Sequence, residues 1–337
     1  MATIKDVARI AGVSISTVSR VINNPESVAQ EKRDAVNQAM KEVAYRPNTL
    51  ARALVSNRSD CIGLMVGELG GIFFAQAMQG IDKVVVQEGK HVIITSGYHT
   101  DHMEREAIEF LIQRRCDGLI LHSKALSDDA LREVASRPTP VVFINRLIPG
   151  LEDRCIFVNN VNGGHLATEF LIQKGHREIA FICSNLASVP DGLEREQGYF
   201  EALRQASIQP RNELVMRAFP DEQGGYEATK RLIHSGQSFS ALFAYSDQMA
   251  VGAINALDDH HLKVPEDVSV IGFDDVDMAK YLRPSLTTIH YPINAMGARA
   301  ALRVLSMIDP EQYPDHGGEL EFIPSLVERK SVIARSA

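Results

Sequence analysis

From residue 60 onward the chain alternates short apolar segments with segments of helical periodicity, and this alternation limits the fold more than any other feature. It is typical of parallel strands that are buried on both faces and joined by crossover helices, as in doubly wound sheets. In such α/β folds ligands bind beyond the carboxyl ends of the strands and, where there are two sheets, between two lobes. Strands are expected at 61–66, 91–95, 118–121, 141–144, 179–183, 214–217, 241–244 and 268–273, and helices at about 74–88, 103–114 and 164–174.

Polar and aromatic residues follow these predicted strands, at the edge where such a sheet gathers its ligand. Carboxylates, an amide, a guanidinium and aromatic rings together suit a polyhydroxylated ligand, because they pair with hydroxyl groups and cover apolar faces. Polar residues are also usual where loops begin, so the spacing alone leaves both interpretations open. The candidates are Phe73, Phe74, His122, Ser123, Asn145, Arg146, Arg195, Ser246, Asp247, Asp274 and Asp275.

The first 59 residues differ from the rest of the chain in charge and in pattern. They carry nine Lys and Arg against five Asp and Glu, a net charge of +4, whereas residues 60–337 carry −12. Apolar residues at helical spacing predict helices that begin after Thr3, after Ser14 and at about Ala29. Gly12 lies in the turn that connects the first two of these helices. Two short helices joined by a glycine-containing turn predict an all-α helix-turn-helix head.

In a helix-turn-helix, residues near the start of the second helix meet base edges in the major groove. Arg20 could bind guanine through two hydrogen bonds and Ile15 could contact a thymine methyl group, with Ser16 and Thr17 beside them. A basic head would also be attracted to phosphate. The alternative is that three short helices form only a packing module, and charge and spacing leave that open.

These segments closely resemble the head of the galactose/lactose repressor family. The resemblance rests on IKDVARIAGVS at 4–14, TVSRVIN at 17–23, YRPN at 45–48 and ARAL at 51–54. It implies that residues 48–55 form a hinge helix and that Leu54 of each subunit is wedged into the minor groove of a palindromic operator. Leu54 could equally be a lone apolar residue in a linker. The DNA contacts expected from the resemblance are Thr3, Ile15, Ser16, Thr17, Arg20, Asn23, Asn48, Ala51 and Leu54.

The resemblance continues over nearly the whole chain and implies a two-lobed, periplasmic-binding-protein-like core. It rests on KGHREI at 174–179, SDQMA at 246–250, SVIGFDD at 269–275 and LTTI at 286–289. Three further segments look closest to the galactose repressor branch: GYH at 97–99, INRLIPG at 144–150 and YPI at 291–293. The resemblance implies that Asn145, Arg195 and Asp274 contact sugar hydroxyls, that Phe73 or Phe74 packs on the sugar ring, and that His122, Ser246, Asp247 and Tyr291 line the same cleft.

Two departures from the family pattern fall at cleft positions. Ser246 stands where the family usually has Asn, and Gly70-Gly71-Ile72 stands where the branch commonly has Ser-Asp-Pro. The expected effector is galactose or a related sugar, and the alternative is a different, longer or differently substituted sugar such as a disaccharide.

The expected domains are a helix-turn-helix DNA-binding domain at 1–47, a hinge helix and linker at 48–59, and an effector-binding and dimerisation core at 60–337. Lobe one is expected at about 60–159 plus 290–318, and lobe two at about 160–288 plus 319–337. The resemblance implies a homodimer. Only residues 333–337 follow the segment that resembles the end of the core, so the C-terminal leucine helix that joins dimers in some members is not expected.

The predicted function is that of a sequence-specific repressor of sugar uptake or catabolism genes, released from its operator by a sugar. No secretory signal and no apolar run long enough to span a bilayer are visible, so a cytoplasmic protein without membrane contact is expected. Cys61, Cys116, Cys155 and Cys183 form no CxxC pair and are expected to be free thiols, with neither a metal site nor a cofactor.

Two other classes of protein fit the sequence less well than a repressor. A solute-binding protein of the same architecture would need an export signal and would lack the basic head. A sugar-modifying enzyme is disfavoured because the chain has no P-loop, GxGxxG, GxSxG or HExxH motif. Asp274 and Asp275 are adjacent at a strand end, where neighbouring side chains point apart, so binding is expected of them rather than acid–base catalysis.

Overall fold

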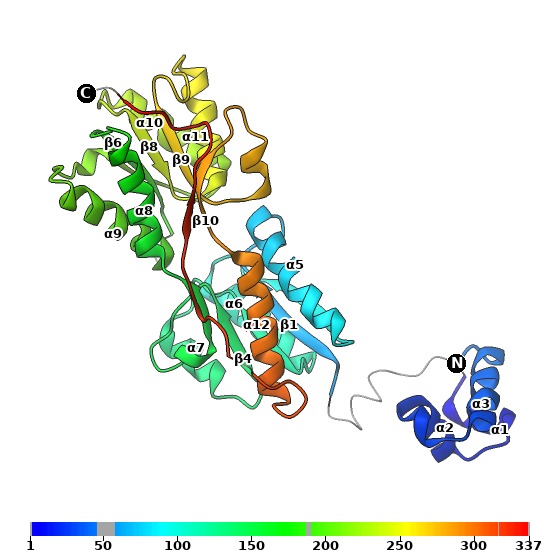
Figure 1. The fold of residues 1–337 in the computed structure, drawn as a ribbon. Helices are drawn as coiled ribbons and strands as arrows, with labels where there is room; N and C mark the ends of the chain where they lie inside the picture. The colour runs from blue at the N-terminus through cyan, green and yellow to red at the C-terminus, as the bar shows by residue number, and fades with distance from the viewer. Residues whose placement is uncertain (1, 46–57, 187–189, 316, 336–337) are drawn as a thin grey trace. The chain divides into compact units, whose positions relative to one another are not determined.

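The computed structural model describes residues 2–45, 58–186, 190–315 and 317–335 of the 337-residue chain. The chain divides into two compact units, Met1–Asp60 and Cys61–Ala337 (Figure 1). No helix in these described ranges has the length and hydropathy needed to cross a membrane.

The N-terminal unit is a small helical bundle. Its core is built from residues at helical spacing, including Val7, Val18, Val21 and Val36, which are all buried. Gly12 has φ +66° in the turn between the first two helices, a conformation that favours glycine. The elements are α1 (Ile4–Ile10), α2 (Ile15–Asn23), the 3₁₀ turn η1 (Pro25–Ser27) and α3 (Gln30–Glu42), so the helix-turn-helix expected from the sequence is present.

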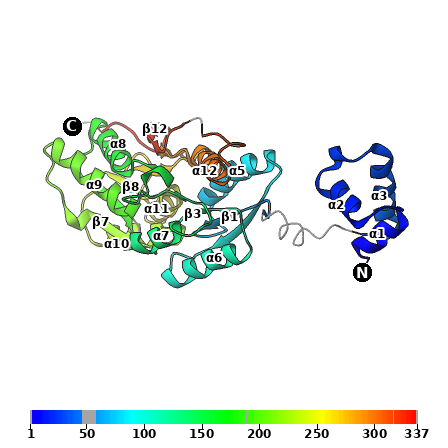
Figure 2. The same ribbon diagram turned by 90° about the horizontal axis from the view of Figure 1, so that it is seen from below.

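The rest of the chain, in its described part, forms two sheets that are mainly parallel, each covered by helices (Figures 1 and 2). The first sheet has the order β11-β5-β4-β3-β1-β2, with every neighbouring pair parallel. Its strands are β1 (Cys61–Val66), β2 (His91–Ser96), β3 (Gly118–Leu121), β4 (Val141–Ile144), β5 (Cys155–Val158) and β11 (Glu321–Phe322), and its helices are α5 (Ile72–Gln87), α6 (Asp101–Gln113), α7 (Asp128–Ala135) and α12 (Ile293–Ile308).

The second sheet has the order β12-β10-β9-β8-β6-β7, and β12 is antiparallel to β10 at its edge. Its strands are β6 (Ile179–Ser184), β7 (Val215–Ala218), β8 (Ala241–Ala244), β9 (Ser269–Asp274), β10 (Thr287–His290) and β12 (Ser325–Val327), and its helices are α8 (Asn160–Gln173), α9 (Pro190–Gln205), α10 (Glu222–His234) and α11 (Asp247–Asp259). Short 3₁₀ turns lie at η2 (Glu152–Arg154), η3 (Asn212–Leu214) and η4 (Asp277–Lys280).

The described chain crosses between the two sheets after β5, after β10 and between β11 and β12. Because β11 pairs with β5 in the first sheet, the last crossing follows residue 322, a few residues later than the expected lobe boundary at 318. The carboxyl ends of the parallel strands of both sheets meet at the cleft described below.

Candidate functional site: a recognition helix and an interlobe cleft

Helix α2 begins with a serine cap that also engages its neighbours. The Ser14 hydroxyl accepts a hydrogen bond from the Thr17 amide at 3.1 Å, and it lies 2.7 Å from the Ser16 hydroxyl and 2.9 Å from the Thr17 hydroxyl. An N-cap of this kind is worth about 1 kcal/mol. The start of the helix is therefore well fixed, and Ser16 and Thr17 have hydroxyl partners within the head.

The outer face of α2 carries the side chains expected to read DNA. Ile15 is 44% exposed although it is a large aliphatic residue, while Val18 and Val21 on the opposite face are buried. Arg20 is exposed and makes no ion pair with any residue the structure describes. Asn23, one turn further on, donates to the Ser19 hydroxyl at 3.2 Å. Ile15 and Arg20 are thus available to an external partner.

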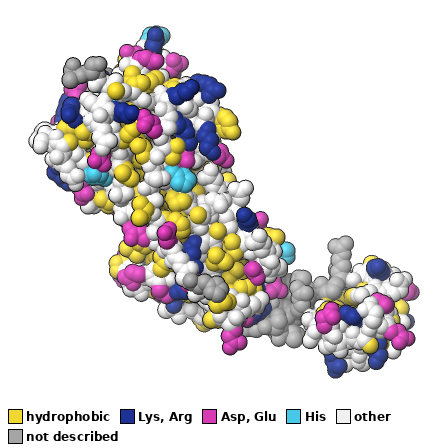
Figure 3. All heavy atoms as spheres, in the orientation of Figure 1, with side chains coloured by type: hydrophobic (Ala, Val, Ile, Leu, Met, Phe, Trp, Pro, Cys, Tyr) yellow, Lys and Arg dark blue, Asp and Glu magenta, His cyan; other side chains and the backbone are white. Residues whose placement is uncertain are grey.

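The remaining expected DNA contacts are Thr3, Asn48, Ala51 and Leu54. Thr3 caps α1, and both its amide and its hydroxyl donate to Asp6, at 2.9 and 2.8 Å. Asn48, Ala51 and Leu54 lie outside the described residues. On the face of the core that Figure 3 shows, acidic and basic side chains are interspersed rather than gathered into a basic patch, which agrees with a chain whose excess of basic residues lies before residue 60.

The second candidate site is a cleft between the two lobes of the core. It encloses about 660 Å³ of empty space, part of it open to solvent, and residues that follow strands of both sheets line it. Asn145 and Asp274 have φ of +61° and +112°, so unusual backbone conformations aim two of these side chains. The lining consists of Glu68, Gly71, Phe73, Phe74, His99, Lys124 and Asn145 from lobe one, and of Asp191, Arg195, Phe219, Pro220, Asp221, Tyr245, Ser246, Gln248 and Asp274 from lobe two.

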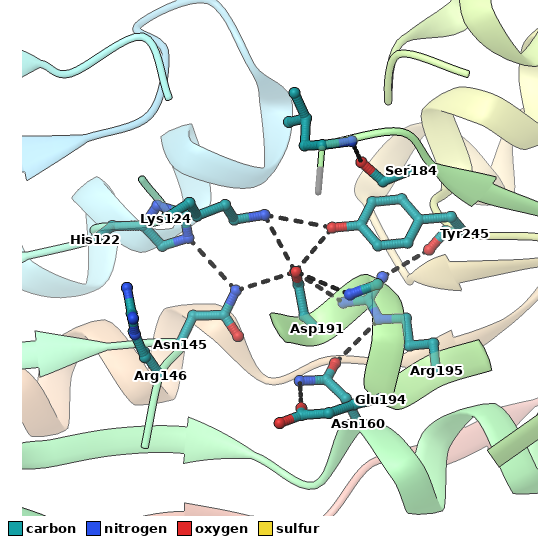
Figure 4. A network of polar contacts seen from close by, with 12 residues as sticks. His122, Lys124, Asn145, Arg146, Asn160, Ser184, Asp191, Glu194, Arg195 and Tyr245 are labelled. Carbon is teal, nitrogen blue, oxygen red and sulfur yellow. Dashed lines mark hydrogen bonds and ion pairs between the residues drawn. The ribbon is translucent and has the colours of Figure 1, made fainter. Parts of the chain in front are cut away.

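Asp191 is the centre of a hydrogen-bond network that joins the lobes (Figure 4). Its carboxylate is 3.1 Å from the Lys124 ammonium of lobe one, and it accepts from the Tyr245 hydroxyl at 2.8 Å. The Asn145 amide, also from lobe one, lies at 3.5 Å. Burial alone would raise the pKa of Asp191, but Lys124 and Arg195 outweigh burial and hold that pKa well below its usual value. Asp191 is therefore a buried anion.

Arg195 is buried at the floor of the cleft, with a side chain only 2% exposed. Its guanidinium donates to the Asn160 side chain at 3.0 Å and to the Tyr245 carbonyl at 2.6 Å, and it lies 3.8 Å from Asp274. It also stacks 3.6 Å from the centre of the Phe273 ring. A buried guanidinium fixed in this way is preorganised to donate to a ligand.

The backbone of Arg195 is fixed by close packing of α9 against α8. A Cβ added at Gly164 of α8 would come within 2.2 Å of the Arg195 carbonyl oxygen, so the two helices approach at a distance that only glycine permits. This contact sets the depth at which Arg195 enters the cleft.

Asp274 differs from Asp191 in its protonation. Burial raises the pKa of Asp274 to about 7, and the attraction of Arg195 only partly opposes this. The neighbouring Asp275 has a lowered pKa, because hydrogen bonds from His290 and Arg329 outweigh its partial burial. The cleft thus combines a carboxylate that is ionised with one that changes protonation near neutral pH.

The pKa of Asp274 predicts a pH-dependent stability. The pKa of Asp274 is near 3.9 in the unfolded state and near 7 in the folded state. At pH values between these two, the folded state binds one proton more than the unfolded state, so the free energy of unfolding falls as the pH rises. Asp274→Asn should remove that contribution, on the order of 2 kcal/mol, when urea unfolding is compared at pH 5 and pH 8.

Asp275→Asn is the matched control for this prediction, because the lowered pKa of Asp275 has the opposite effect. This variant should lose stability at pH 8 relative to the parent. If Asp274→Asn kept the full pH dependence of the parent protein, Asp274 would not be the group responsible.

The structure brings most of the expected ligand contacts together. Phe73, Phe74, Asn145, Arg195, Ser246 and Asp274 all line the cleft. Tyr291 lies behind them, where its hydroxyl donates to the Asn145 side chain and its ring packs edge-on against Phe73 at 5.1 Å. His122 is also behind the lining, with its buried ring 4.9 Å from that of Phe74.

Asp247 was expected in the lining, but it is not among the residues that line the cleft. It accepts from the Thr288 hydroxyl at 2.6 Å and from the Val276 amide at 2.9 Å. Gly272 lets it approach, since a Cβ there would lie 2.2 Å from the same carboxylate. Through these contacts Asp247 links α11 to β9 and β10.

Sequence reasoning missed several lining residues, of which Lys124, Asp191 and Tyr245 matter most. Asp191 and Arg195 are four residues apart on α9, so both lie on one face of the helix. This spacing could have indicated from the sequence that Asp191 accompanies Arg195. Lys124 and Tyr245 follow strands, as the named candidates do, so the same rule applied to every strand would have included them. His99 and Phe219 also follow predicted strands, at 91–95 and 214–217, so the same rule would have included them as well.

Comparison with known proteins gives consistent matches for both units. Residues 3–48 match the model of bacterial regulatory proteins of the lacI family, and residues 168–332 match that of the periplasmic binding protein-like domain. The HTH-type transcriptional regulator GalR of Escherichia coli (strain K12) is 43% identical over 332 residues, 98% of this chain and 96% of the relative. The HTH-type transcriptional regulator GalS of Salmonella typhimurium (strain LT2) is 41% identical over 335 residues, 99% of this chain and 98% of the relative.

A solved structure of similar length also matches. The crystal structure of the lac repressor dimer bound to operator and the anti-inducer ONPF superposes with a TM-score of 0.86 at 29% identity, and the match covers 99% of each chain.

Proposed function

Because the chain belongs to the lacI family of bacterial regulatory proteins, we propose that it is a DNA-binding transcriptional repressor whose operator affinity is lowered by a sugar bound in the interlobe cleft. The head supplies sequence recognition through Ile15, Ser16 and Arg20 of α2. The core supplies the sensor. The relatives it matches are transcription regulators, and we assign it no catalytic activity.

One observation carries the sugar assignment: the cleft combines buried charged groups with aromatic rings. Arg195 donates, Asp191 and Asp274 accept, and Phe73 and Phe74 offer apolar surface in the same cavity. Sugars present the complementary surface, with hydroxyl groups at the edges of a ring whose faces carry C–H groups. Galactose or a related sugar is the effector we propose, as the resemblance to the galactose repressor branch implies.

The response to the sugar follows from the position of the cleft. A ligand that contacts residues of both lobes stabilises one relative arrangement of them, and a coupling of about 1–3 kcal/mol changes the affinity of the other site by roughly 5- to 150-fold. We propose a homodimer, which a palindromic operator requires, and a cytoplasmic location, where the operator is accessible. The proposed domains are 1–47, 48–59 and 60–337, with the hinge region outside the described residues.

Operator binding with and without sugar tests this proposal. DNA fragments selected by the full-length protein from genomic DNA are titrated by fluorescence anisotropy in the presence of galactose, fucose, glucose or disaccharides at one salt concentration. We expect a preferred palindromic sequence and a 5- to 150-fold loss of affinity with at least one sugar. Absence of any sequence preference, or indifference to every sugar, would contradict the proposal.

A further inference from the structure

Two histidines that the proposed function does not use lie side by side in lobe two. His234 is the last residue of α10, and His260 directly follows α11. Their Nε2 atoms are 3.3 Å apart, and their ring centres are 5.3 Å apart with the rings inclined at 68°. Because the nitrogens are closer together than the ring centres, the two Nε2 atoms lie on the facing edges of the rings.

The backbone fixes which nitrogen of His260 carries its hydrogen. The Nδ1 atom lies 2.8 Å from the Ala256 carbonyl oxygen, which can only accept a hydrogen bond. Nδ1 is therefore the donor, and Nε2 of the neutral ring presents a lone pair towards His234. Histidines that bind metals usually donate their other nitrogen to a carbonyl or a carboxylate in this way, because that hydrogen bond fixes the ring and its tautomer.

The separation of the two nitrogens suits two ligands of one metal ion. Imidazole binds Zn²⁺ at about 2.0 Å in a tetrahedral arrangement, so two such nitrogens lie about 3.3 Å from each other. A hydrogen bond from the His234 Nε2–H to the His260 lone pair is the competing explanation of the same distance. The two residues are far apart in sequence, so no motif of closely spaced ligands indicates the pair.

The surroundings of the pair favour a cation. Both α10 and α11 end here, and the carboxyl end of a helix carries a partial negative charge. Asp258 and Asp259, in the last turn of α11, are exposed to solvent. His234 is also exposed and His260 is half-buried, so a hydrated ion can reach both rings. Within the described ranges no third His, Cys, Asp or Glu joins them in a larger ligand group, so water molecules would complete the coordination.

The two helices hold the pair on a rigid frame, because they run side by side in the same direction. Gln248 of α11 donates to Glu222 of α10 at 3.2 Å near their amino ends. His260 meets His234 at their carboxyl ends, with the same offset of 26 residues. Between these contacts the backbones touch, since a Cβ added at Gly225 would lie 2.2 Å from a backbone oxygen of α11. Ligands that are held in place before binding lose little conformational freedom when the ion binds.

We propose that His234 and His260 form a binding site for a divalent transition-metal ion such as Zn²⁺. The two Nε2 atoms bind the ion, which joins the carboxyl ends of α10 and α11. The amino ends of the same helices are capped by Asp221 and Ser246, which line the cleft. The ion therefore stabilises the pair of helices that carries these two cleft residues.

Titration calorimetry of the full-length protein with zinc chloride, after treatment with EDTA and dialysis, tests this proposal. We expect the strongest binding event to involve one ion per chain, and the melting temperature to rise with zinc concentration, because the ion binds the folded state. His260→Ala should weaken this binding tenfold or more. His234→Gln should weaken it equally but leave the melting temperature without zinc unchanged, because the glutamine amide can still donate to the His260 Nε2 atom.

His261→Ala and His165→Ala are the matched controls, and both should keep zinc affinity within twofold. His261 is exposed and adjacent to His260, whereas His165 of α8 lies 3.7 Å from the carboxylate of Glu169. The metal site is refuted if zinc does not bind, or if His234→Gln and His260→Ala bind it as tightly as the parent protein. The two rings would then share only a hydrogen bond. Neither sugar nor DNA enters these measurements, so their outcome is independent of the proposed function.

Discussion

Replacing Arg195 with alanine is expected to abolish the response to sugar while operator binding survives. Arg195 contributes a buried guanidinium to the cleft, and its contacts with Asn160, Tyr245 and Asp274 are all within the core. The recognition helix α2 belongs to the other compact unit. The loss should therefore fall on one activity only.

The expected effect is large because the variant removes a buried hydrogen-bond donor from the cleft and a cation that lies close to both Asp191 and Asp274. Removing one partner of a buried ion pair typically costs about 3–5 kcal/mol. Asp274 can take up a proton, whereas Asp191 keeps Lys124 as a partner. We expect sugar affinity to fall by about 100-fold or more. The melting temperature should also fall, so operator and sugar titrations are made well below the unfolding transition that calorimetry measures.

Arg217→Ala is the matched control for this experiment. Arg217 also lies in the second lobe, but it is exposed and pairs with Glu196 outside the cleft. It should retain sugar affinity and operator release within about twofold, since exposed ion pairs contribute little. A protein with Arg195→Ala that still releases its operator on adding sugar would contradict the assignment of the cleft as the sensor.

The fold was largely predictable because its main signal is local. Apolar segments such as 118–121 and 141–144 are flanked by polar turns, and the structure has strands β3 and β4 at those positions. The strands that escaped prediction are β5, β10, β11 and β12, of which β11 has only two residues. Such short strands are stabilised by pairing with a neighbouring strand that is distant in sequence. The pattern of apolar residues within a short segment does not record that pairing.

The site was predictable only in part, and for a related reason. Asp274 ends a predicted strand within the SVIGFDD motif, Arg195 was expected from the resemblance, and both line the cleft. The contact between Lys124 and Asp191 joins residues 67 positions apart, on different lobes. Asp247 was expected beside Ser246 in the lining, but its carboxylate is hydrogen-bonded to Thr288 and Val276, and it does not line the cleft. Side-chain direction depends on tertiary neighbours that spacing does not record.

Arg20→Ala is expected to cause the largest loss of sequence-specific DNA binding. Arg20 is exposed on α2, and a guanidinium that binds guanine through two hydrogen bonds contributes about 1–3 kcal/mol of discrimination. In the proposed dimer both subunits lose this contact, so operator affinity should fall by about 100-fold or more at fixed salt. Non-specific DNA, which is bound through phosphate charge alone, should lose much less.

Lys32→Ala is the matched control, because Lys32 is an exposed cation on α3 of the same head. It removes one positive charge without touching the recognition helix, so specific and non-specific affinity should fall by the same small factor. Sugar affinity should be unchanged in both variants. Equal losses of specific and non-specific binding in Arg20→Ala would mean that Arg20 contacts phosphate rather than a base, and sequence recognition would then have to come from Ile15 and Ser16.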